Sequence, residues 1–326
     1  MNLFRRLFGS KEQKESKESQ TKPLSDEEAY KRAVEKTMEE AAETKPMIEV
    51  TEGITQTRPL PPPKEFVGTT DRFTVGQTSN VGRMRSNNQD ACLSMVVSPN
   101  MVGDPPAIGF FVVADGMGGH TDGEQASAVT VQTLAQHVLD EIVMPHLVGR
   151  ERSSDQKTIA EVLSDAMLSA NEATQRNVPN GGTTATCAVI RGDLAYIAHV
   201  GDSRAYLISE GNMELVTRDH SLVRRLQELG QLTPEEAEVH PQRNVLYRAI
   251  GQGEALEVDA ATRRLPPSSR LLLCSDGLWG LVDEEKMKEV LEEFPDPQAV
   301  CDRLIELANE AGGSDNITAL LIQMPT

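Results

Sequence analysis

The sequence lacks the patterns that mark secreted, membrane-spanning and zinc-binding proteins. It contains no run of 18 apolar residues that could cross a bilayer and no apolar segment typical of a secretory leader. Its four cysteines show neither CxxC nor Cys/His spacing, so we expect buried thiols instead of metal ligands or disulfides. Together these absences favour a protein of the reducing cytoplasm.

Basic residues are scarce as well. The chain has 32 Lys and Arg against 50 Asp and Glu, a formal net charge of -18. Binding to a phosphate backbone requires clustered Lys and Arg, so nucleic acid is not expected as the main partner. The acidity is uneven, because residues 1–66 carry 12 Lys and Arg against 13 Asp and Glu, whereas residues 67–326 carry 20 against 37. Bound cations would relieve part of the negative charge of the second part.

The first 66 residues lack the regular apolar pattern of a folded core, and we predict a flexible low-complexity tail over residues 1–66. Residues 57–64 form a proline-rich linker that closes it. Residues 25–42 begin with a capping-box pattern but offer few apolar side chains, which predicts a transient or partner-dependent helix. Residues 1–8 place apolar side chains on one helical face, as in segments that dock weakly on a membrane or a protein, and a disordered start is the equal alternative.

Residues 67–326 show the apolar patterns of a folded domain that contains both helices and strands. Residues 123–143 and 159–175 repeat apolar side chains at helical spacing, which predicts two amphipathic helices. Three predicted strands between residues 184 and 208 are joined by short polar turns that leave no room for helical crossovers. The strands should therefore pair antiparallel, and a doubly wound parallel sheet is disfavoured.

Four aspartates stand at the ends of apolar runs that are typical of buried strands: Asp115, Asp202, Asp276 and Asp315. Such carboxylates, if clustered without compensation, would repel one another. Mg²⁺ and Mn²⁺ are suitable counter-charges, because these hard cations bind carboxylate, carbonyl and water oxygens. The sequence therefore predicts a hydrolytic site that holds several metal ions.

Seven segments between residues 79 and 321 carry a resemblance to a known family. They read, in order, SNVGRMRSNNQD, VVADGMGGHTDGEQAS, GGTTATCAVI, HVGDSRAYLI, TRDHSLV, LLLCSDGLWGLV and SDNITALL. This series resembles the bacterial type of the metal-dependent Ser/Thr protein phosphatases, the type 2C or PPM family. The resemblance implies an α+β fold, a four-layer α-β-β-α sandwich of two antiparallel sheets flanked by helices, with metals in a cleft at one end. It also implies hydrolysis of phosphoserine and phosphothreonine in proteins by a metal-activated water.

The resemblance assigns the metal ligands residue by residue. Asp115 matches the aspartate that bridges two metal ions, and the carbonyl of Gly116 is a further ligand. Asp276 and Asp315 match the remaining carboxylates on one of these ions. Asp202, together with Asp276, matches a third and weaker site. We therefore expect two tightly bound Mn²⁺ or Mg²⁺ ions and a third that binds less tightly.

Other residues match supporting roles. Asp90 resembles an acid that orients metal-bound waters, although an ordinary turn aspartate is the alternative. Arg85 aligns with the arginine that grips the substrate phosphate, for which a guanidinium fork is well suited, and Arg83 is the competing candidate. Asn316 is expected to fix the loop around Asp315 by hydrogen bonds from its side chain to the backbone.

Two positions depart from the family pattern. Gln89 stands where many members have a glutamate that reaches metal-bound water, so affinity at one site is expected to be lower. Met117 stands where eukaryotic relatives have the histidine proposed as general acid, and a thioether cannot donate a proton. His120 and His220 are nearby alternatives, each at least as well explained by a structural role, and the general acid stays unassigned.

Three functions are consistent with the sequence, and an active protein phosphatase is favoured because every metal-binding aspartate is present. A hydrolase for small phosphate esters, or a catalytically weak regulatory binding module, are the alternatives. Residues 221–250 correspond to a variable flap near the cleft that selects substrates. The expected partners are proteins phosphorylated by Ser/Thr kinases, with weak docking through residues 1–8, and the protein is expected to be a monomer.

Overall fold

The structure, a computed structural model, describes residues 73–98, 106–119, 121–148, 156–253 and 255–326. The fold below belongs to the compact unit Glu65–Thr326. The predicted tail over residues 1–66, with its transient helix and its docking segment, lies outside the described residues. The described part contains no helix that is both long and apolar enough to cross a membrane. The four cysteines are free thiols, and three of them are buried.

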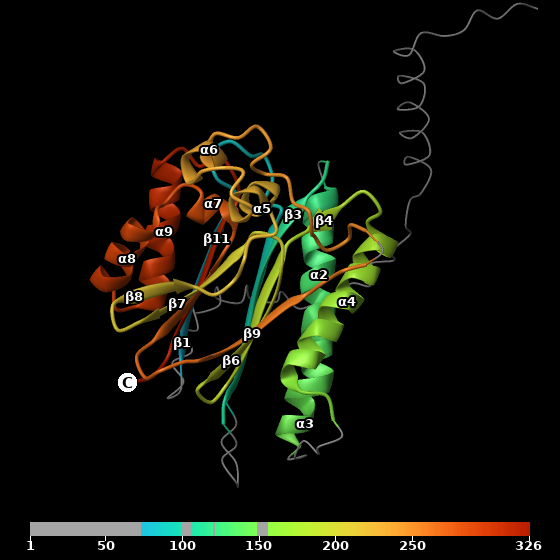
Figure 1. The fold of residues 1–326 in the computed structure, drawn as a ribbon. Coiled ribbons are helices and arrows are strands. Elements are labelled where there is room, and N and C mark those ends of the chain that lie inside the picture. The colour runs from blue at the N-terminus through green and yellow to red at the C-terminus, as the bar shows by residue number, and fades with distance from the viewer. Residues whose placement is uncertain (1–72, 99–105, 120, 149–155, 254) are drawn as a thin grey trace, which may run out of the picture. The chain divides into compact units, whose positions relative to one another are not determined.

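Two antiparallel sheets form the centre of the domain (Figure 1). The first sheet has, in spatial order, β1 (Thr74–Asn80), β11 (Ile317–Gln323), β10 (Arg270–Cys274), β7 (Arg204–Ser209) and β8 (Asn212–Leu215). The second has β2 (Asp90–Val97), β3 (Ile108–Met117), β5 (Ala185–Arg191), β6 (Leu194–Val200) and β9 (Asp259–Arg264), with the short β4 (Gly182–Thr183) paired to β3. Every strand pair in the described part is antiparallel. The short turn between β5 and β6 joins an antiparallel pair, as predicted, but the expected pairing of β6 with β7 is wrong, because the turn between them carries the chain from the second sheet into the first.

Helices cover the outer face of each sheet (Figure 1). The second sheet is covered by α2 (Asp122–Val138) and α4 (Ile159–Asn177), and the first by α8 (Glu284–Glu293) and α9 (Pro297–Glu310). The shorter elements are η1 (Leu139–Val143), α3 (Met144–Leu147), α5 (Leu222–Glu228), α6 (Pro234–Glu238) and α7 (Asp276–Trp279). The two amphipathic helices predicted from the sequence are therefore present, the first as α2 continued by the π-helical η1.

The domain has four layers of secondary structure, helices on each side of the two sheets. Three clusters of buried apolar side chains fill the spaces between them. Side chains of consecutive strand residues point to opposite faces of a sheet. In β3, Phe110 and Val112 accordingly pack toward α2 and α4, while Phe111 and Val113 pack against the first sheet. Leu304 of α9 belongs to the third cluster, which lies between the first sheet and the helices α8 and α9. Strand β3 is thus buried on both faces, which explains why its sequence is apolar without alternation.

Candidate active site

Asp90 and Asp115 lie opposite each other where β2 and β3 pair. The next residue after Asp115 is Gly116, whose backbone N–H donates to the carbonyl of Gln89 at 3.1 Å. A Cβ at Gly116 would lie 2.1 Å from the carbonyl oxygen of Gly123 in α2, so no larger residue fits there. The glycine therefore brings the start of α2 against the strand end that carries Asp115.

Asp276 and Asp315 reach the same region from the first sheet. Asp276 is the first residue of α7 and follows β10, while Asp315 comes shortly before β11. Strands β10 and β11 are antiparallel neighbours, with Cys274 paired to Ala319, so the end of one strand meets the start of the other. Antiparallel pairing thus places two carboxylates that are distant in sequence at one sheet edge.

Asp90 connects the two sheets. Its Oδ2 accepts hydrogen bonds from Ser275 Oγ at 2.8 Å and from Thr318 Oγ1 at 2.6 Å. Ser275 lies between β10 and α7, and Thr318 lies in β11. The sequence singled out Asp90 as a neighbour of the metal ligands, but neither hydroxyl partner was predicted, because the partners lie about two hundred residues away along the chain.

The site carboxylates are buried and strongly interacting. Burial raises the pKa of Asp115 well above its ordinary value, and the neighbouring charges of Asp276, Asp90 and Asp202 raise it further. Burial also raises the pKa of Asp276, with a second contribution from the charge of Asp315. For Asp90, burial outweighs the two hydroxyl donors and raises the pKa to about 7. Positive charge at this point would therefore be strongly favoured.

The donor set fits hard divalent cations. Within the described residues, Asp90 Oδ1 and Asp276 Oδ1 are buried without a hydrogen-bond partner. Such oxygens are costly unless another group satisfies them. In the described part, no group of three or more Asp, Glu, His or Cys side chains is arranged to hold a metal ion without further ligands. Coordination would have to be completed by the Gly116 carbonyl and by water, which matches the tendency of Mg²⁺ to retain several waters.

Asp202 lies in the turn between β6 and β7 and is also buried, which raises its pKa. The preceding Gly201 has a φ of 112°, a conformation that favours glycine. Its N–H donates to His220 Nδ1 at 3.0 Å, and the backbone N–H of His220 donates back to its carbonyl at 2.7 Å. Trp279 Nε1–H donates to the Asp202 carbonyl at 3.0 Å. His220 and Trp279 therefore hold this turn, which fits the structural role given above as the alternative for His220. The sequence predicted no role for Trp279.

A hydroxyl pair connects the Asp202 turn with Asp115. Thr184 Oγ1 lies 2.7 Å from Ser203 Oγ and accepts a hydrogen bond from the backbone N–H of Asp115 at 2.9 Å. Thr183 Oγ1 donates to the Asp115 carbonyl at 2.8 Å. These threonines belong to the segment GGTTATCAVI, and their hydroxyls fix the backbone that carries the predicted bridging carboxylate.

Arg85 forms an ion pair with Asp315, with 2.7 Å between Nη2 and Oδ2, and its side chain is half-exposed. Arg83, the competing candidate, bonds through its backbone N–H to the carbonyl of Gly313. The side chain of Asn316 donates to the carbonyls of Val81 and Asn87. It also accepts from the backbone N–H of Gln89 at 2.8 Å. Asn316 thus fastens the loop that precedes β2, in addition to bonding Asp315 Oδ1 through its own N–H.

The predicted alternatives for the general acid have distinct positions. Met117 ends β3, and its sulfur lies 3.6 Å from Gln252 Nε2. His220 Nε2 lies 3.2 Å from Asp259 Oδ2, so the ring is occupied at both nitrogens. His120 lies outside the described residues. Arg204 donates Nε and Nη2 to the carboxylate of Asp219 and stacks on Trp279, with 3.6 Å from its Cζ to the ring centroid.

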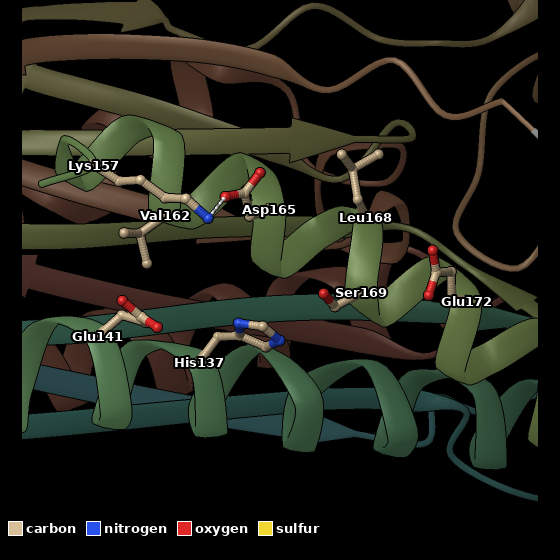
Figure 2. Close-up of a pocket in the computed structure, with 8 residues that line it drawn as sticks. All are labelled: His137, Glu141, Lys157, Val162, Asp165, Leu168, Ser169 and Glu172. Carbon is tan, nitrogen blue, oxygen red and sulfur yellow. Dashed lines mark ion pairs between the residues drawn. The ribbon is translucent and has the colours of Figure 1, made fainter.

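A surface pocket of about 320 Å³ lies elsewhere, between α2, η1 and α4 (Figure 2). Its polar lining includes His137, Glu141 and Glu172, and Lys157 forms an ion pair with Asp165 at 2.6 Å. None of the predicted site residues lines it. The pocket is therefore separate from the carboxylate cluster.

Comparison with known proteins gives consistent results. The sequence model of the family described as Protein phosphatase 2C matches residues 76–317. Serine/threonine phosphatase stp of Listeria innocua is 38% identical over 243 residues, covering 74% of this chain and 92% of that protein. Protein phosphatase PhpP of Streptococcus pneumoniae is 35% identical over 251 residues, covering 77% and 97%.

Solved structures agree with the sequence comparison. The Mycobacterium tuberculosis serine/threonine phosphatase PstP/Ppp superposes with a TM-score of 0.66 at 32% identity, covering 78% of this chain and 100% of that one. The catalytic domain of PstP in complex with two manganese ions superposes with a TM-score of 0.64 at 31% identity, covering 78% and 99%. The two-sheet sandwich is thus shared with both structures.

Proposed function

Because the chain belongs to the protein phosphatase 2C family and is a metal-dependent serine/threonine protein phosphatase, we propose that its buried aspartates hold the metal ions of catalysis. Asp115 would bridge two ions, with the Gly116 carbonyl as a further ligand. Asp276 and Asp315 would complete the protein ligands of one ion. The unpartnered, buried Asp276 Oδ1 is the observation that carries this assignment.

Two divalent cations, when bound, supply a water of lowered pKa for attack on phosphorus and positive charge for the phosphoryl oxygens. The chain's own residues would do the positioning. Asp90, held by Ser275 and Thr318, would use its unpartnered Oδ1 to orient water. Arg85, anchored on Asp315 and half-exposed, would offer its remaining N–H donors to the substrate phosphate.

Release of phosphate from phosphothreonine peptides tests this assignment. Activity is expected with Mn²⁺ and is expected to be lost in chelator and in Asp276→Asn. The same assay on small phosphate esters separates a protein phosphatase from a small-ester hydrolase, because only the former would prefer peptides at equal concentration. Wild-type turnover by a folded Asp276→Asn protein would refute the ligand assignment.

Several further properties belong to the same proposal. Asp202, with Asp276, would hold a third ion more weakly. Its buried carboxylate and its firmly held turn support that role. The substrates would be products of Ser/Thr kinases, acted on by a cytoplasmic monomer. Residues 1–66 would be a tail outside the catalytic domain of residues 67–326, with residues 1–8 available for weak docking.

A further inference from the structure

One carboxylate is surrounded by three arginines: Arg218, just before the flap, and Arg224 and Arg225, in its helix α5. Arg218 donates through Nε and Nη2 to the two oxygens of Glu228, the first at 2.7 Å. Arg224 Nε lies 3.8 Å from Glu228 Oε1, and Arg225 Nη1 lies 3.6 Å from Oε2. Three positive charges therefore share one ion-pair partner in a protein whose formal net charge is -18.

These arginines keep donors available for another anion. Their side chains are 48%, 46% and 52% exposed, in chain order, whereas Glu228 is 25% exposed. Each guanidinium has five N–H donors, so one carboxylate cannot occupy all of them. Among the described residues, no acid other than Glu228 forms an ion pair with these three arginines.

Stability alone does not explain the arrangement. Exposed ion pairs contribute little to folding, and a single pair between Arg218 and Glu228 would already fasten α5. The second and third guanidiniums add repulsion between like charges. The close approach of these guanidinium groups is better explained if an anion binds between them and offsets their repulsion.

The arginine triad of Arg218, Arg224 and Arg225 lies on both sides of His220 in the sequence, and His220 holds the turn that carries Asp202. Helix α5 begins just after His220, whose backbone and ring bond the turn that carries Asp202. Arg224 follows His220 by four residues, so their Cα atoms are at most about 15 Å apart. Figure 1 shows α5 and α7 at the same end of the domain.

The far end of the flap is tied to the site as well. Leu222 N–H donates to the Val245 carbonyl at 2.8 Å, which closes the flap on itself. Ile250 pairs with Thr183, whose hydroxyl bonds the Asp115 carbonyl. Arg224 and Arg225 are therefore carried by a segment fastened at both ends to residues that hold the predicted ligands.

On the basis of the proposed function, we propose that the arginine triad binds an anionic side chain of the protein substrate, a carboxylate or a second phosphate. An extended chain advances about 3.3 Å per residue, and the bound of about 15 Å between the Cα atoms of Arg224 and His220 corresponds to roughly five residues. We therefore place this side chain within roughly five residues of the phosphoresidue being hydrolysed. Arginine forks bind both carboxylate and phosphate, and a dianionic phosphate should bind more tightly. The triad thus selects acidic or multiply phosphorylated segments.

The test compares phosphothreonine peptides that differ at one position, two to five residues from the phosphothreonine. That position carries Gln, Glu or phosphoserine, and turnover of p-nitrophenyl phosphate normalises each enzyme preparation. We expect wild-type kcat/KM to be roughly tenfold higher for the anionic peptides, the size of one additional charge-assisted contact. The ratio should approach one in Arg224→Gln/Arg225→Gln and fall below one in Arg224→Glu/Arg225→Glu.

Arg303→Gln provides the matched control, because Arg303 also pairs with exposed acids but lies on the outer helix α9. It should keep the wild-type ratio. Equal kcat/KM for all three peptides in the wild type, or an unchanged ratio in the double variants, would overturn the proposal. A higher ratio for phosphoserine than for Glu would identify the second phosphate as the preferred ligand.

Fluorescence anisotropy of labelled peptides separates this inference from the proposed function. If wild-type protein with Mn²⁺ hydrolyses neither phosphopeptide nor p-nitrophenyl phosphate, the proposed function fails. Tighter binding of the anionic peptide, lost in Arg224→Gln/Arg225→Gln, would still support the triad as an anion site. Equal binding of the peptides would overturn it.

Discussion

At the scale of single residues, Asp90 shows how the site keeps a carboxylate that burial disfavours. Two hydroxyl donors stabilise one oxygen, yet its pKa is raised to about 7 because desolvation is the larger effect. The other oxygen is buried without a partner among the described residues. The unpartnered oxygen can therefore accept a cation or a positioned water, and its burial lowers the free energy of unfolding of the metal-free protein.

We expect the free energy of unfolding of the metal-free protein to decrease as pH rises from about 4 to about 7. Folded Asp90 keeps its proton up to about pH 7, whereas an unfolded aspartate loses it near 3.9. The folded state therefore binds more protons in this window and loses stability as they leave. Urea titrations at several pH values should show a change on the order of a few kcal/mol. Asp90→Asn should make the dependence shallower, and the remainder would come from Asp115, Asp202 and Asp276, whose pKa values are also raised by burial. The same slope in this variant would contradict the shifted pKa of Asp90.

Asp276→Asn and Asp202→Ala should distinguish a ligand of the catalytic metal pair from a ligand of the third, weaker site. Asp276→Asn removes an anionic ligand from the catalytic pair and is expected to lower phosphopeptide turnover by roughly three orders of magnitude or more. Asp202→Ala should leave the tight sites intact and raise the Mn²⁺ concentration needed for full rate. Calorimetric titration checks the second outcome, and loss of tight binding in Asp202→Ala would show that its assignment is wrong.

Met117→Ala should lower turnover by less than roughly tenfold, because a thioether has no proton to transfer. The expected cost is lost packing and the contact with Gln252. Steady-state kinetics across pH provide the measurement, with thermal unfolding as the control for folding. A loss of three orders of magnitude in a stable variant would show that this position contributes to catalysis directly.

At the scale of elements, the sequence predicts the strands and helices well and the contacts between them poorly. Apolar runs ending in Asp115 and Asp276 identify strand ends, because buried strands need continuous apolar residues and the catalytic groups interrupt them. The short turn between β5 and β6 predicts their antiparallel pairing correctly, whereas the short turn between β6 and β7 joins two different sheets, which the sequence did not predict. The hydroxyls of Ser275 and Thr318 could not be assigned, because serine and threonine are common on strands and only the assembled sheets bring them to Asp90.

The C-terminal end of α8 provides a prediction at this scale. Arg270 in β10 donates Nη1 to the carbonyls of Leu291 and Phe294, the latter at 3.2 Å. These carbonyls lack helical partners at a helix end, so a cation there satisfies them and complements the helix dipole. Arg270→Leu should lower the free energy of unfolding by about 1–3 kcal/mol. Urea unfolding measures the loss, and phosphopeptide turnover per folded molecule should not change.

At the scale of the whole molecule, charge is distributed unevenly along the chain. Residues 67–326 carry nearly all of the excess acid, while residues 1–66 are close to neutral. Metal ions would neutralise part of the acid at the catalytic end of the domain, and the arginine triad forms a local positive site beside it. An acidic protein can thus receive anionic substrates at one place while repelling them elsewhere.

Deletion of residues 1–66 should leave the melting temperature and the phosphopeptide turnover of the domain almost unchanged. These residues are rich in Lys, Glu, Ser and Gln and offer few apolar side chains to a core, and a proline-rich linker at residues 57–64 separates them from it. Their role would then be location or recruitment, through the apolar face of residues 1–8. Co-sedimentation with anionic liposomes and pull-down assays should distinguish full-length protein from protein starting at Val67. Identical behaviour in both assays would exclude docking through residues 1–8, and a large drop in melting temperature would show that the tail contributes to the fold.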